Sequence, residues 1–297
     1  MSESNAAVDL GQPPLVVKIG GARAVDPAGV IEDVAHIVAA GREVVVVHGG
    51  STAVDDTLEA MGTEPEYVET PAGVSGRFTD AETMDVFSMV LPGKLNTELV
   101  TDLRAAGVNA VGLSGVDGGL LTGPRKSAVR IVEDGKRKIR RGDHAGKPES
   151  VNGDLLSSLL ADGYVPTVSP PMLADDDTAV NADADRVAAL LAAALGAELV
   201  LLTDVDGVYA DPDDPETLID EASTPAEFDT VEAAATGFMS RKVHAAEEAL
   251  AGGATGVVVS DAGLRKPLLG ALDGHGTWID PAAVVDSAGD GTGGESA

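Results

Sequence analysis

Short runs of aliphatic and β-branched residues alternate with amphipathic stretches along most of the chain. The uninterrupted apolar runs predict buried strands, because a strand covered on both faces can be apolar at every position. These runs occupy residues 15–21, 43–50, 108–114, 164–169, 197–205 and 255–260. Helical periodicity predicts helices between them, at 27–40, 51–61, 150–161, 182–195 and 241–251. The alternation predicts an α/β protein with an open, mainly parallel sheet and helices on both faces, a three-layer αβα sandwich.

Two stretches depart from this simple alternation. Residues 80–106 have the pattern of one long helix, which we expect to kink or break at Pro92-Gly93 because proline lacks an amide proton. Residues 210–229 are acidic and rich in proline, and we expect an irregular passage there.

The amino-acid composition excludes several classes of function. The 297 residues include 49 acidic and 20 basic side chains, which gives a formal net charge of −29. Such a surface repels nucleic acid and anionic membranes, and it suits the salty cytoplasm of a halophile, where ions screen the self-repulsion. Cysteine is absent from the sequence, so disulfides and thiolate sites are excluded. No run of 18 apolar residues predicts a transmembrane helix, and we expect a soluble, cytoplasmic protein.

Basic residues are concentrated in one segment. Residues 125–147 contain nine of the 20 lysines and arginines, and they have the pattern of a β-hairpin with its turn at Glu133-Asp134-Gly135. A basic hairpin on an acidic protein predicts a docking site for an acidic partner or substrate. Its candidate docking residues are Arg125, Lys126, Arg130, Lys136, Arg137, Lys138, Arg140 and Arg141.

Glycine pairs end the first two predicted strands. Unsatisfied N–H groups at such turns form anion sites, and a lysine beside them favours phosphate. The residues concerned are Lys18, Gly20 and Gly21 after the first strand, and Gly49, Gly50 and Ser51 after the second. Taken alone, the first stretch could equally be a solvated lysine before an ordinary turn.

The sequence has no P-loop motif, the glycine-rich stretch GLSGVDGG (112–119) lacks the GxGxxG order, and the five histidines have no metal-ligand spacing. What remains is a set of lysines and aspartates next to turns or helix starts. Phosphoryl transfer needs little beyond positioning and positive charge around the transferred group, with Mg²⁺ bridging the nucleotide oxygens. The set fits this chemistry, and its members are Lys18, Asp183, Asp204, Asp206 and Lys242.

Six motifs in order resemble those of the amino acid kinase family, and specifically of acetylglutamate kinases, over about residues 14–280. They are KIGG (18–21), HGGS (48–51), GRFTDAETMDVFSMVLPGKLN (76–96), VNADADRVAALLAAALGA (180–197), LLTDVDGV (201–208) and GFMSRKVHAAEEAL (237–250). The resemblance implies ATP-dependent phosphorylation of a side-chain carboxylate to an acyl phosphate. It also implies an open eight-stranded αβα sandwich and a homodimer.

The resemblance divides the chain into two lobes. We expect an acyl-acceptor lobe over residues 15–170, which includes the basic hairpin, and an ATP-binding lobe over residues 171–280. The flanking residues 1–14 and 281–297 are small, polar and glycine-rich, and they predict disordered tails.

The matching charged residues receive roles from this resemblance. Lys18 and Lys242 correspond to lysines on opposite sides of the transferred phosphoryl group, and Asp183 to an aspartate that holds both lysines. Two such cations stabilise the charge that spreads over the phosphoryl oxygens. ATP is the donor, and Mg²⁺ is bound through ATP rather than by protein ligands. The alternative for Asp183 is a plain helix cap.

Other matching residues are assigned to substrate binding. Arg77 corresponds to a clamp for the α-carboxylate of the acceptor, which arginine can hold by two parallel hydrogen bonds. The alternative for Arg77 is a surface ion pair. The remaining assignments are Gly49, Gly50, Ser51 and Asn181 to the acceptor, and Gly20, Gly21, Asp204 and Asp206 to the phosphates of ATP.

Two positions depart from the acetylglutamate kinase pattern. Ser51 replaces the last glycine of HGGG, and Ala179 replaces an asparagine that lies two residues before an Asn-Ala-Asp triplet. We expect Asn181 to supply part of the missing contact.

The segments 76–87 and 125–147 resemble the branch of this family that acts on an amino acid attached to LysW, a small acidic carrier protein. A basic hairpin suits docking of such a carrier. The resemblance therefore implies a kinase for carrier-bound glutamate, carrier-bound α-aminoadipate, or both, in arginine and lysine biosynthesis. The alternative is an acetylglutamate kinase that acts on free N-acetylglutamate. A non-catalytic nucleic-acid-binding protein is a third hypothesis, which the net charge and the lysine–aspartate set disfavour.

Overall fold

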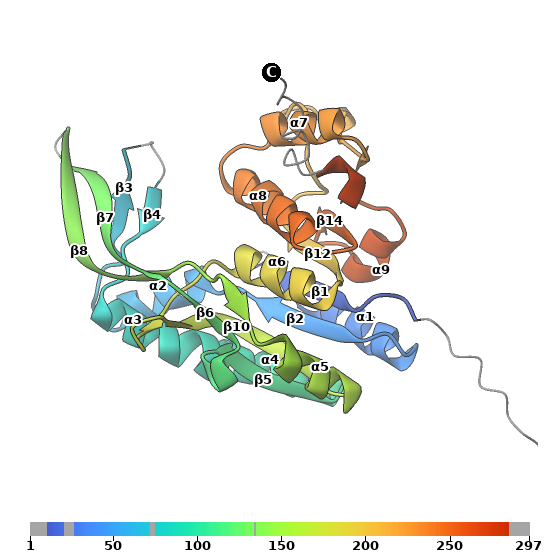
Figure 1. Ribbon diagram of the computed structural model, residues 1–297, viewed down its shortest axis with the longest axis horizontal. Coiled ribbons are helices and arrows are strands. Elements are labelled where there is room, and N and C mark those ends of the chain that lie inside the picture. The colour runs from blue at the N-terminus through green and yellow to red at the C-terminus, as the bar shows by residue number, and fades with distance from the viewer. Residues whose placement is uncertain (1–10, 21–26, 72–74, 134, 285–297) are drawn as a thin grey trace, which may run out of the picture.

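The computed structural model describes residues 11–20, 27–71, 75–133 and 135–284 (Figure 1). Gly21 and most of the two expected tails lie outside these residues. The expected boundary of the second tail is too early, because Pro281–Ala283 forms a short 3-10 helix.

A mainly parallel sheet lies at the centre of the molecule. Strand β1 (Leu15–Ile19) lies between β2 (Val44–His48) and β12 (Glu198–Thr203), and it is parallel to both. Parallel pairing continues to β14 (Gly256–Asp261) on one side and to β10 (Val165–Ala174) on the other. The residues of β1 and β2 are all buried, as their unbroken apolar pattern predicts.

Short strands extend this sheet at its edges. In the described residues the sheet has 11 strands rather than the expected eight, in the order β13-β15-β14-β12-β1-β2-β10-β6-β9, with β5 and β11 also paired to β10. Strand β5 (Ala110–Gly115) confirms the strand predicted at 108–114. The shorter strands are β6 (Leu121–Gly123), β9 (Ser150–Val151), β11 (Ala179–Val180), β13 (Glu221–Ala222) and β15 (Thr277–Ile279). Strands of two or three residues carry too little periodicity to be found in the sequence.

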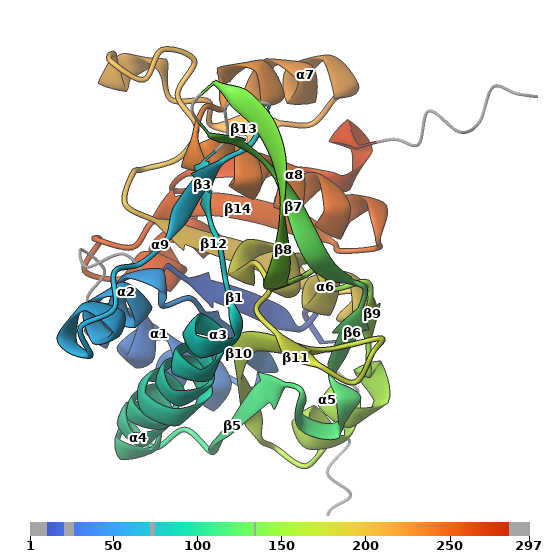
Figure 2. The same ribbon diagram turned by 90° about the vertical axis from the view of Figure 1, so that its left-hand side faces the viewer.

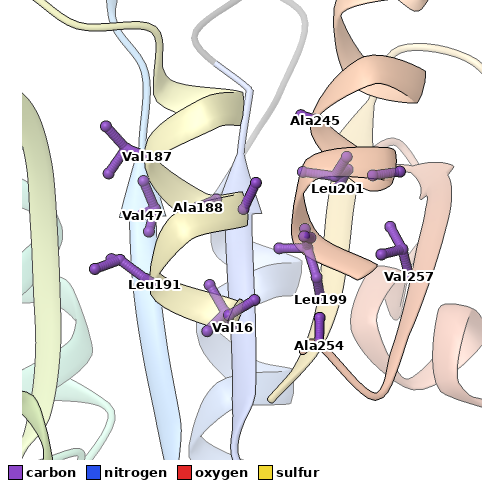
Figure 3. Packing of buried hydrophobic residues seen from close by; sticks show 14 of the residues in the cluster. Val16, Val47, Val187, Ala188, Leu191, Leu199, Leu201, Ala245, Ala254 and Val257 are labelled. Atoms are coloured by element: carbon purple, nitrogen blue, oxygen red, sulfur yellow. The ribbon is translucent and has the colours of Figure 1, made fainter. Parts of the chain in front are cut away.

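Helices cover both faces of the sheet, which confirms the predicted αβα sandwich. One face packs against α1 (Ala28–Ala39), α4 (Asn96–Ala105) and α9 (Pro267–Leu272). The other packs against α5 (Gly153–Ala161), α6 (Ala184–Leu195), α7 (Pro225–Ala234) and α8 (Phe238–Ala251). Figure 3 shows this second interface, with Val187, Ala188 and Leu191 of α6 against Val16 and Val47 of the sheet.

The expected long helix is interrupted where its proline predicts. Helix α3 (Ala81–Ser88) passes into a π-helical segment (Met89–Leu95) that contains Pro92, and α4 follows directly. Helix α2 (Ser51–Ala60) packs against α3 and this segment in a third small core.

Two hairpins extend from the sheet on the side where α6 and α8 lie (Figures 1 and 2). The larger is the predicted basic hairpin, formed by β7 (Arg125–Glu133) and β8 (Lys136–Gly146). The smaller is formed by β3 (Tyr67–Glu69) and β4 (Ser75–Arg77), which the sequence pattern did not predict.

Helix α7 corrects the expectation of an irregular passage up to residue 229. Thr224 and Glu227 form a reciprocal capping box, and Pro225 occupies the first turn. This spacing is a known helix-start signal that lies within the proline-rich stretch. No helix in the described part of the chain is both long and apolar enough to span a membrane.

Candidate active site

Two buried lysines meet one aspartate where β1 ends. Lys18 lies on β1, on the face covered by α6, and its Nζ is 2.7 Å from Asp185 Oδ1. Lys242, in the second turn of α8, places its Nζ 3.1 Å from Asp185 Oδ2. All three residues are buried, with no more than 8% of any of them exposed. The arrangement brings together the two predicted lysines.

The bridging aspartate is Asp185, so the expectation for Asp183 is wrong. Asp183 is the N-cap of α6, and its Oδ1 accepts hydrogen bonds from the backbone N–H groups of Asp185 and Arg186 at 3.0 and 3.1 Å. A capping side chain folds back over its own helix, and here it does not reach the lysines. The cap in turn starts the helix so that Asp185 faces the sheet.

Counted from Asp185, the departure moves from Ala179 to Asp183. Asn181 lies four residues before the bridging aspartate, and Asp183 is where the triplet has asparagine. The peptide of Asn181 bonds to the base of the basic hairpin: its N–H donates to the His144 carbonyl and its carbonyl accepts from Gly146 N–H, at 2.8 and 2.7 Å.

Mutual charges control the protonation of the three residues. Burial alone would raise the pKa of Asp185, but Lys18 and Lys242 lower it below its ordinary value. Burial and the neighbouring charge of Lys18 lower the pKa of Lys242, and Asp185 opposes that shift. With all three groups ionised the net charge is +1, which favours an anionic ligand.

The three residues lie in a cavity of about 420 Å³. Helices α2 and α8 begin at this cavity, and each has a glycine N-cap, Gly50 or Gly237, with no side-chain cap. Gly237 has φ of +58°, a conformation that favours glycine. Uncapped N-terminal N–H groups attract phosphate, so two lysines and two helix ends surround this space.

Several predicted residues line the cavity and others do not. Gly20, Gly49, Gly50, Ser51, Asp183 and Asp204 line it together with the three charged residues. The Thr203 hydroxyl donates to Asp204 at 3.1 Å. Asp206, in contrast, accepts from the Tyr209 hydroxyl and lies 3.4 Å from His275 Nε2, away from the lining. The structure therefore does not bring Asp206 to the predicted phosphate site.

Arg77 is held outside the cavity lining. Its guanidinium donates to both carboxylate oxygens of Asp55 on α2 and to the Tyr67 hydroxyl at 2.9 Å. The rings of Tyr67 and Phe87 lie 5.1 and 5.4 Å from it. The ion-pair alternative thus describes its present partners, and contact with an acceptor carboxylate stays a prediction.

The hairpin has two different faces. Residues paired across its ladder share a face, and one face carries Ala128, Arg130 and Val132 opposite Arg141, Ile139 and Arg137. The three arginines are exposed, and Ile139 is 65% exposed. We call Arg130, Arg137, Ile139 and Arg141 the outer arginine face.

The remaining predicted docking residues are of two kinds: some are exposed, and others are paired with groups within the protein. Arg125 donates to the Asp143 carbonyl at 2.9 Å and to the ring of His144, and Arg140 pairs with Glu66 and stacks on Phe78. Arg125 thus lies at the base of the hairpin and Arg140 midway along it, and both already have partners within the protein, although 41% of the Arg140 side chain is exposed. Lys126, Lys136 and Lys138 are exposed, and Lys138 pairs with Glu133.

Sequence reasoning missed several residues of the cavity, and two of them, Asp185 and Phe238, show what signal the sequence held. Asp185 had a usable signal, because it shares the buried stripe of α6 with Ala188, Ala189 and Ala192 at helical spacing, and an acid on such a stripe needs a cation. For Phe238 the only signal in the sequence was its position within a motif that matches the family. It lines the cavity with 80% of its surface exposed, and the Arg241 guanidinium lies 5.6 Å from its ring.

Comparisons with known proteins agree with this geometry. A model of the amino acid kinase family matches residues 13–261. The chain is 45% identical to the LysW-aminoadipate kinase of Deinococcus radiodurans over 89% of this chain and 91% of that protein. It is 42% identical to the acetylglutamate kinase of Methanopyrus kandleri over 89% of this chain and 99% of that protein.

Solved structures support the fold. The N-acetylglutamate synthase of Neisseria gonorrhoeae has a TM-score of 0.71 at 24% identity, over 90% of this chain, which spans 59% of the length of that protein. A carbamate kinase of Giardia has a TM-score of 0.63 at 17% identity, over 91% of this chain and 99% of that one.

Proposed function

The chain belongs to the amino acid kinase family, and from this premise we propose that it phosphorylates the side-chain carboxylate of LysW-bound glutamate, α-aminoadipate or both. The observation that carries the proposal is the buried Lys18–Asp185–Lys242 group in a cavity of about 420 Å³ at which two uncapped helices begin.

The group accounts for the chemistry of transfer. An ionised acceptor carboxylate attacks the terminal phosphorus of ATP, an O–P bond forms, and the bond to the bridging oxygen breaks to release ADP. No base is needed, because a carboxylate has no proton to remove at neutral pH. Lys18 and Lys242 stabilise the charge on the phosphoryl oxygens, and Asp185 keeps both ammonium groups in position.

The donor side of the cavity fits a nucleotide. Phe238 offers an exposed ring on which a base can stack, and Arg241 lies beside it. Asp204 offers a carboxylate at the same cavity, which suits Mg²⁺ bound by phosphates and one carboxylate. When bound, the ion would neutralise phosphate charge. The described residues include no group of three or more side chains arranged to hold a metal alone.

The outer arginine face supports a carrier-bound acceptor. Three exposed arginines around an exposed isoleucine suit a partner that is acidic and partly apolar. Relatives named LysW-aminoadipate kinase and LysW-aminoadipate/LysW-glutamate kinase, at 43% and 36% identity, support the same assignment. Glutamate and α-aminoadipate differ by one methylene, a difference worth only about 1–3 kcal/mol in a pocket, so both acceptors are included.

A hydroxamate assay with ATP and Mg²⁺ tests the proposal. Hydroxylamine traps an acyl phosphate, and we expect product with LysW-glutamate or LysW-α-aminoadipate and little with free N-acetylglutamate. Lys18→Met serves as the inactive control. Brisk turnover of free N-acetylglutamate would instead support an acetylglutamate kinase, the second candidate, which the Methanopyrus relative favours.

Four further features belong to the same proposal. The residues 15–170 and 171–280 act as acceptor and nucleotide lobes, although one continuous sheet joins them. The protein works as a homodimer in the cytoplasm, and its net charge of −29 adapts it to high salt. Light scattering tests the homodimer, and activity measured against salt concentration tests the adaptation to high salt.

A further inference from the structure

His48 ends β2 on the opposite face of the sheet from Lys18. Val46, two residues earlier, packs in the core that α1 and α4 cover, whereas Val47 packs in the core beneath α6. Side chains alternate along a strand, so His48 shares the face of Val46. It is 5% exposed, and the transfer step described above does not use it.

Asn96, the first residue of α4, fixes the tautomer of His48. Its amide nitrogen donates to the Thr167 carbonyl at 2.8 Å and to His48 Nε2 at 3.2 Å. Since Nε2 accepts, the proton of a neutral ring is on Nδ1. Nδ1–H then donates to the Gly49 carbonyl at 2.9 Å. Both ring nitrogens of His48 and the amide nitrogen of Asn96 therefore have complementary partners.

The bond to Gly49 determines where the next N–H group points. A peptide is planar and trans, so the Gly49 carbonyl and the Gly50 N–H point in opposite directions. The carbonyl is held on the face of His48, so the planar peptide directs the Gly50 N–H the other way, toward the face of Lys18; the two glycines line the cavities on both faces. A Cβ on Gly50 would overlap Leu91 and Leu95, so the turn also fits closely against the segment before Asn96.

We propose that neutral His48, held by Asn96, is a positioning residue that aims the Gly50 N–H at the transferred phosphoryl group. The proposal rests on the proposed phosphoryl transfer, and it assigns function to a buried contact on the far side of the sheet. The pair acts through the glycine turn and touches neither substrate.

Protonation would break this arrangement. In a protonated ring Nε2 also carries a hydrogen, which would point at the amide N–H group of Asn96, so two donors would face each other. Rotating the Asn96 amide would relieve that contact but would place its oxygen against the Thr167 carbonyl oxygen, so two acceptors would face each other. Burial lowers the pKa of His48 below its ordinary value of 6.5, and the bond to the Gly49 carbonyl opposes this shift.

Charged groups approach His48 from several elements. Asp56 on α2, and Glu98 and Asp102 on α4, line a cavity on its own face, and Lys18 lies on the other face. With the ring neutral at pH 7, protonation of His48 is expected to lower activity on the acid side.

Two substitutions of His48 separate positioning from packing. His48→Asn places an amide nitrogen near the position of Nδ1 and does not titrate, whereas His48→Leu removes the donor. We expect kcat of His48→Asn within about threefold of the native value, and kcat of His48→Leu about 100-fold lower, the usual effect of losing one aligned donor. The acid limb of the native pH profile should be absent from His48→Asn. His36→Asn, an exposed histidine on α1, should leave the profile unchanged.

A second measurement does not depend on activity. Long-range ¹H–¹⁵N NMR of the native protein should show His48 as the Nδ1–H tautomer at pH 7, assigned by its loss in His48→Asn. If no acceptor is phosphorylated, the proposed function fails and this spectrum still tests the tautomer. An Nε2–H tautomer, an acid limb that persists in His48→Asn, or equal losses of kcat in the two folded variants would overturn the proposal.

Discussion

Asp185→Asn removes the negative charge between Lys18 and Lys242 and changes little else in size. The two ammonium nitrogens lie 2.7 and 3.1 Å from its oxygens in a buried site. Breaking a buried ion pair leaves uncompensated charge and costs about 3–5 kcal/mol of unfolding free energy. Lys242 is expected to lose its proton first, because burial and Lys18 already lower its pKa.

The substitution should also remove most of the transfer activity. A neutral Lys242 no longer stabilises the phosphoryl charge, and loss of one such contact lowers kcat by about 10²–10³-fold. Asp183→Asn is the matched control two residues away. Asparagine caps a helix about as well as aspartate, so stability should change by less than about 0.5 kcal/mol and kcat by less than about threefold.

The hydroxamate assay and urea unfolding measure the two effects on the same protein samples. We expect a large loss of kcat and of unfolding free energy for Asp185→Asn, and little change in either quantity for Asp183→Asn. A reversed order, with Asp183→Asn the more damaging of the two, would refute the assignment of Asp185 as the bridging aspartate. Loss of kcat without loss of stability would refute the buried-charge argument alone.

Three further predictions concern the donor side, the hairpin and acid pH. Phe238→Ala should raise the KM for ATP about tenfold, because base stacking is worth about 1–3 kcal/mol. In steady-state kinetics the same variant should leave the KM for the acceptor unchanged, and the control variant Tyr164→Ala should leave both KM values unchanged. Glutamate at all three arginines of the outer arginine face should abolish turnover of the carrier-bound acceptor, whereas glutamate at Lys136 and Lys138, on the other face, should reduce it far less. Two buried groups, His48 and Asp185, should each lower the unfolding free energy as the pH falls. The folded-state pKa of His48 is lowered, so its stabilisation is present above its ordinary pKa of 6.5 and is lost as pH falls below it. The pKa of Asp185 is likewise lowered, so its stabilisation is lost only as pH falls below about 3.8, and chemical denaturation from pH 8 to 3 measures both losses.

The repeating elements of the fold were predictable because their periodicity is long and strong. The unbroken apolar runs of β1, β2 and β12, and the proline at the π-helical segment, all led to correct elements. The short strands and the β3–β4 hairpin were not predictable, because two or three residues contain no measurable period and their pairing is set by tertiary contacts. Helix α7 could have been found, since its capping box lies in the sequence.

The site was predicted at the level of residue types rather than of partners. Lys18 and Lys242 lie together as expected, yet two aspartates separated by one residue could not be distinguished by matching a motif. Their roles depend on helix phase: Asp183 lies before the first turn, where it caps, and Asp185 lies on the stripe that faces the sheet. The ion pair of Arg77 could likewise not be predicted from the sequence, because its partner Asp55 lies on another element and comes close only in the folded protein.

The division of the hairpin into two faces bears on how a carrier could bind at high salt. Attraction between separated charges is screened within about 3 Å at 1 M salt, so long-range steering would contribute little there. The structure offers contacts that act at short range: arginines, which can pair with carboxylates through two hydrogen bonds, and Ile139, whose burial is not weakened by salt. Because the outer arginine face combines both kinds of contact, docking on it should persist as salt rises, whereas a contact made only by Lys136 and Lys138 should weaken. Carrier binding measured by calorimetry from low to high salt, in proteins altered on one face or the other, distinguishes these cases.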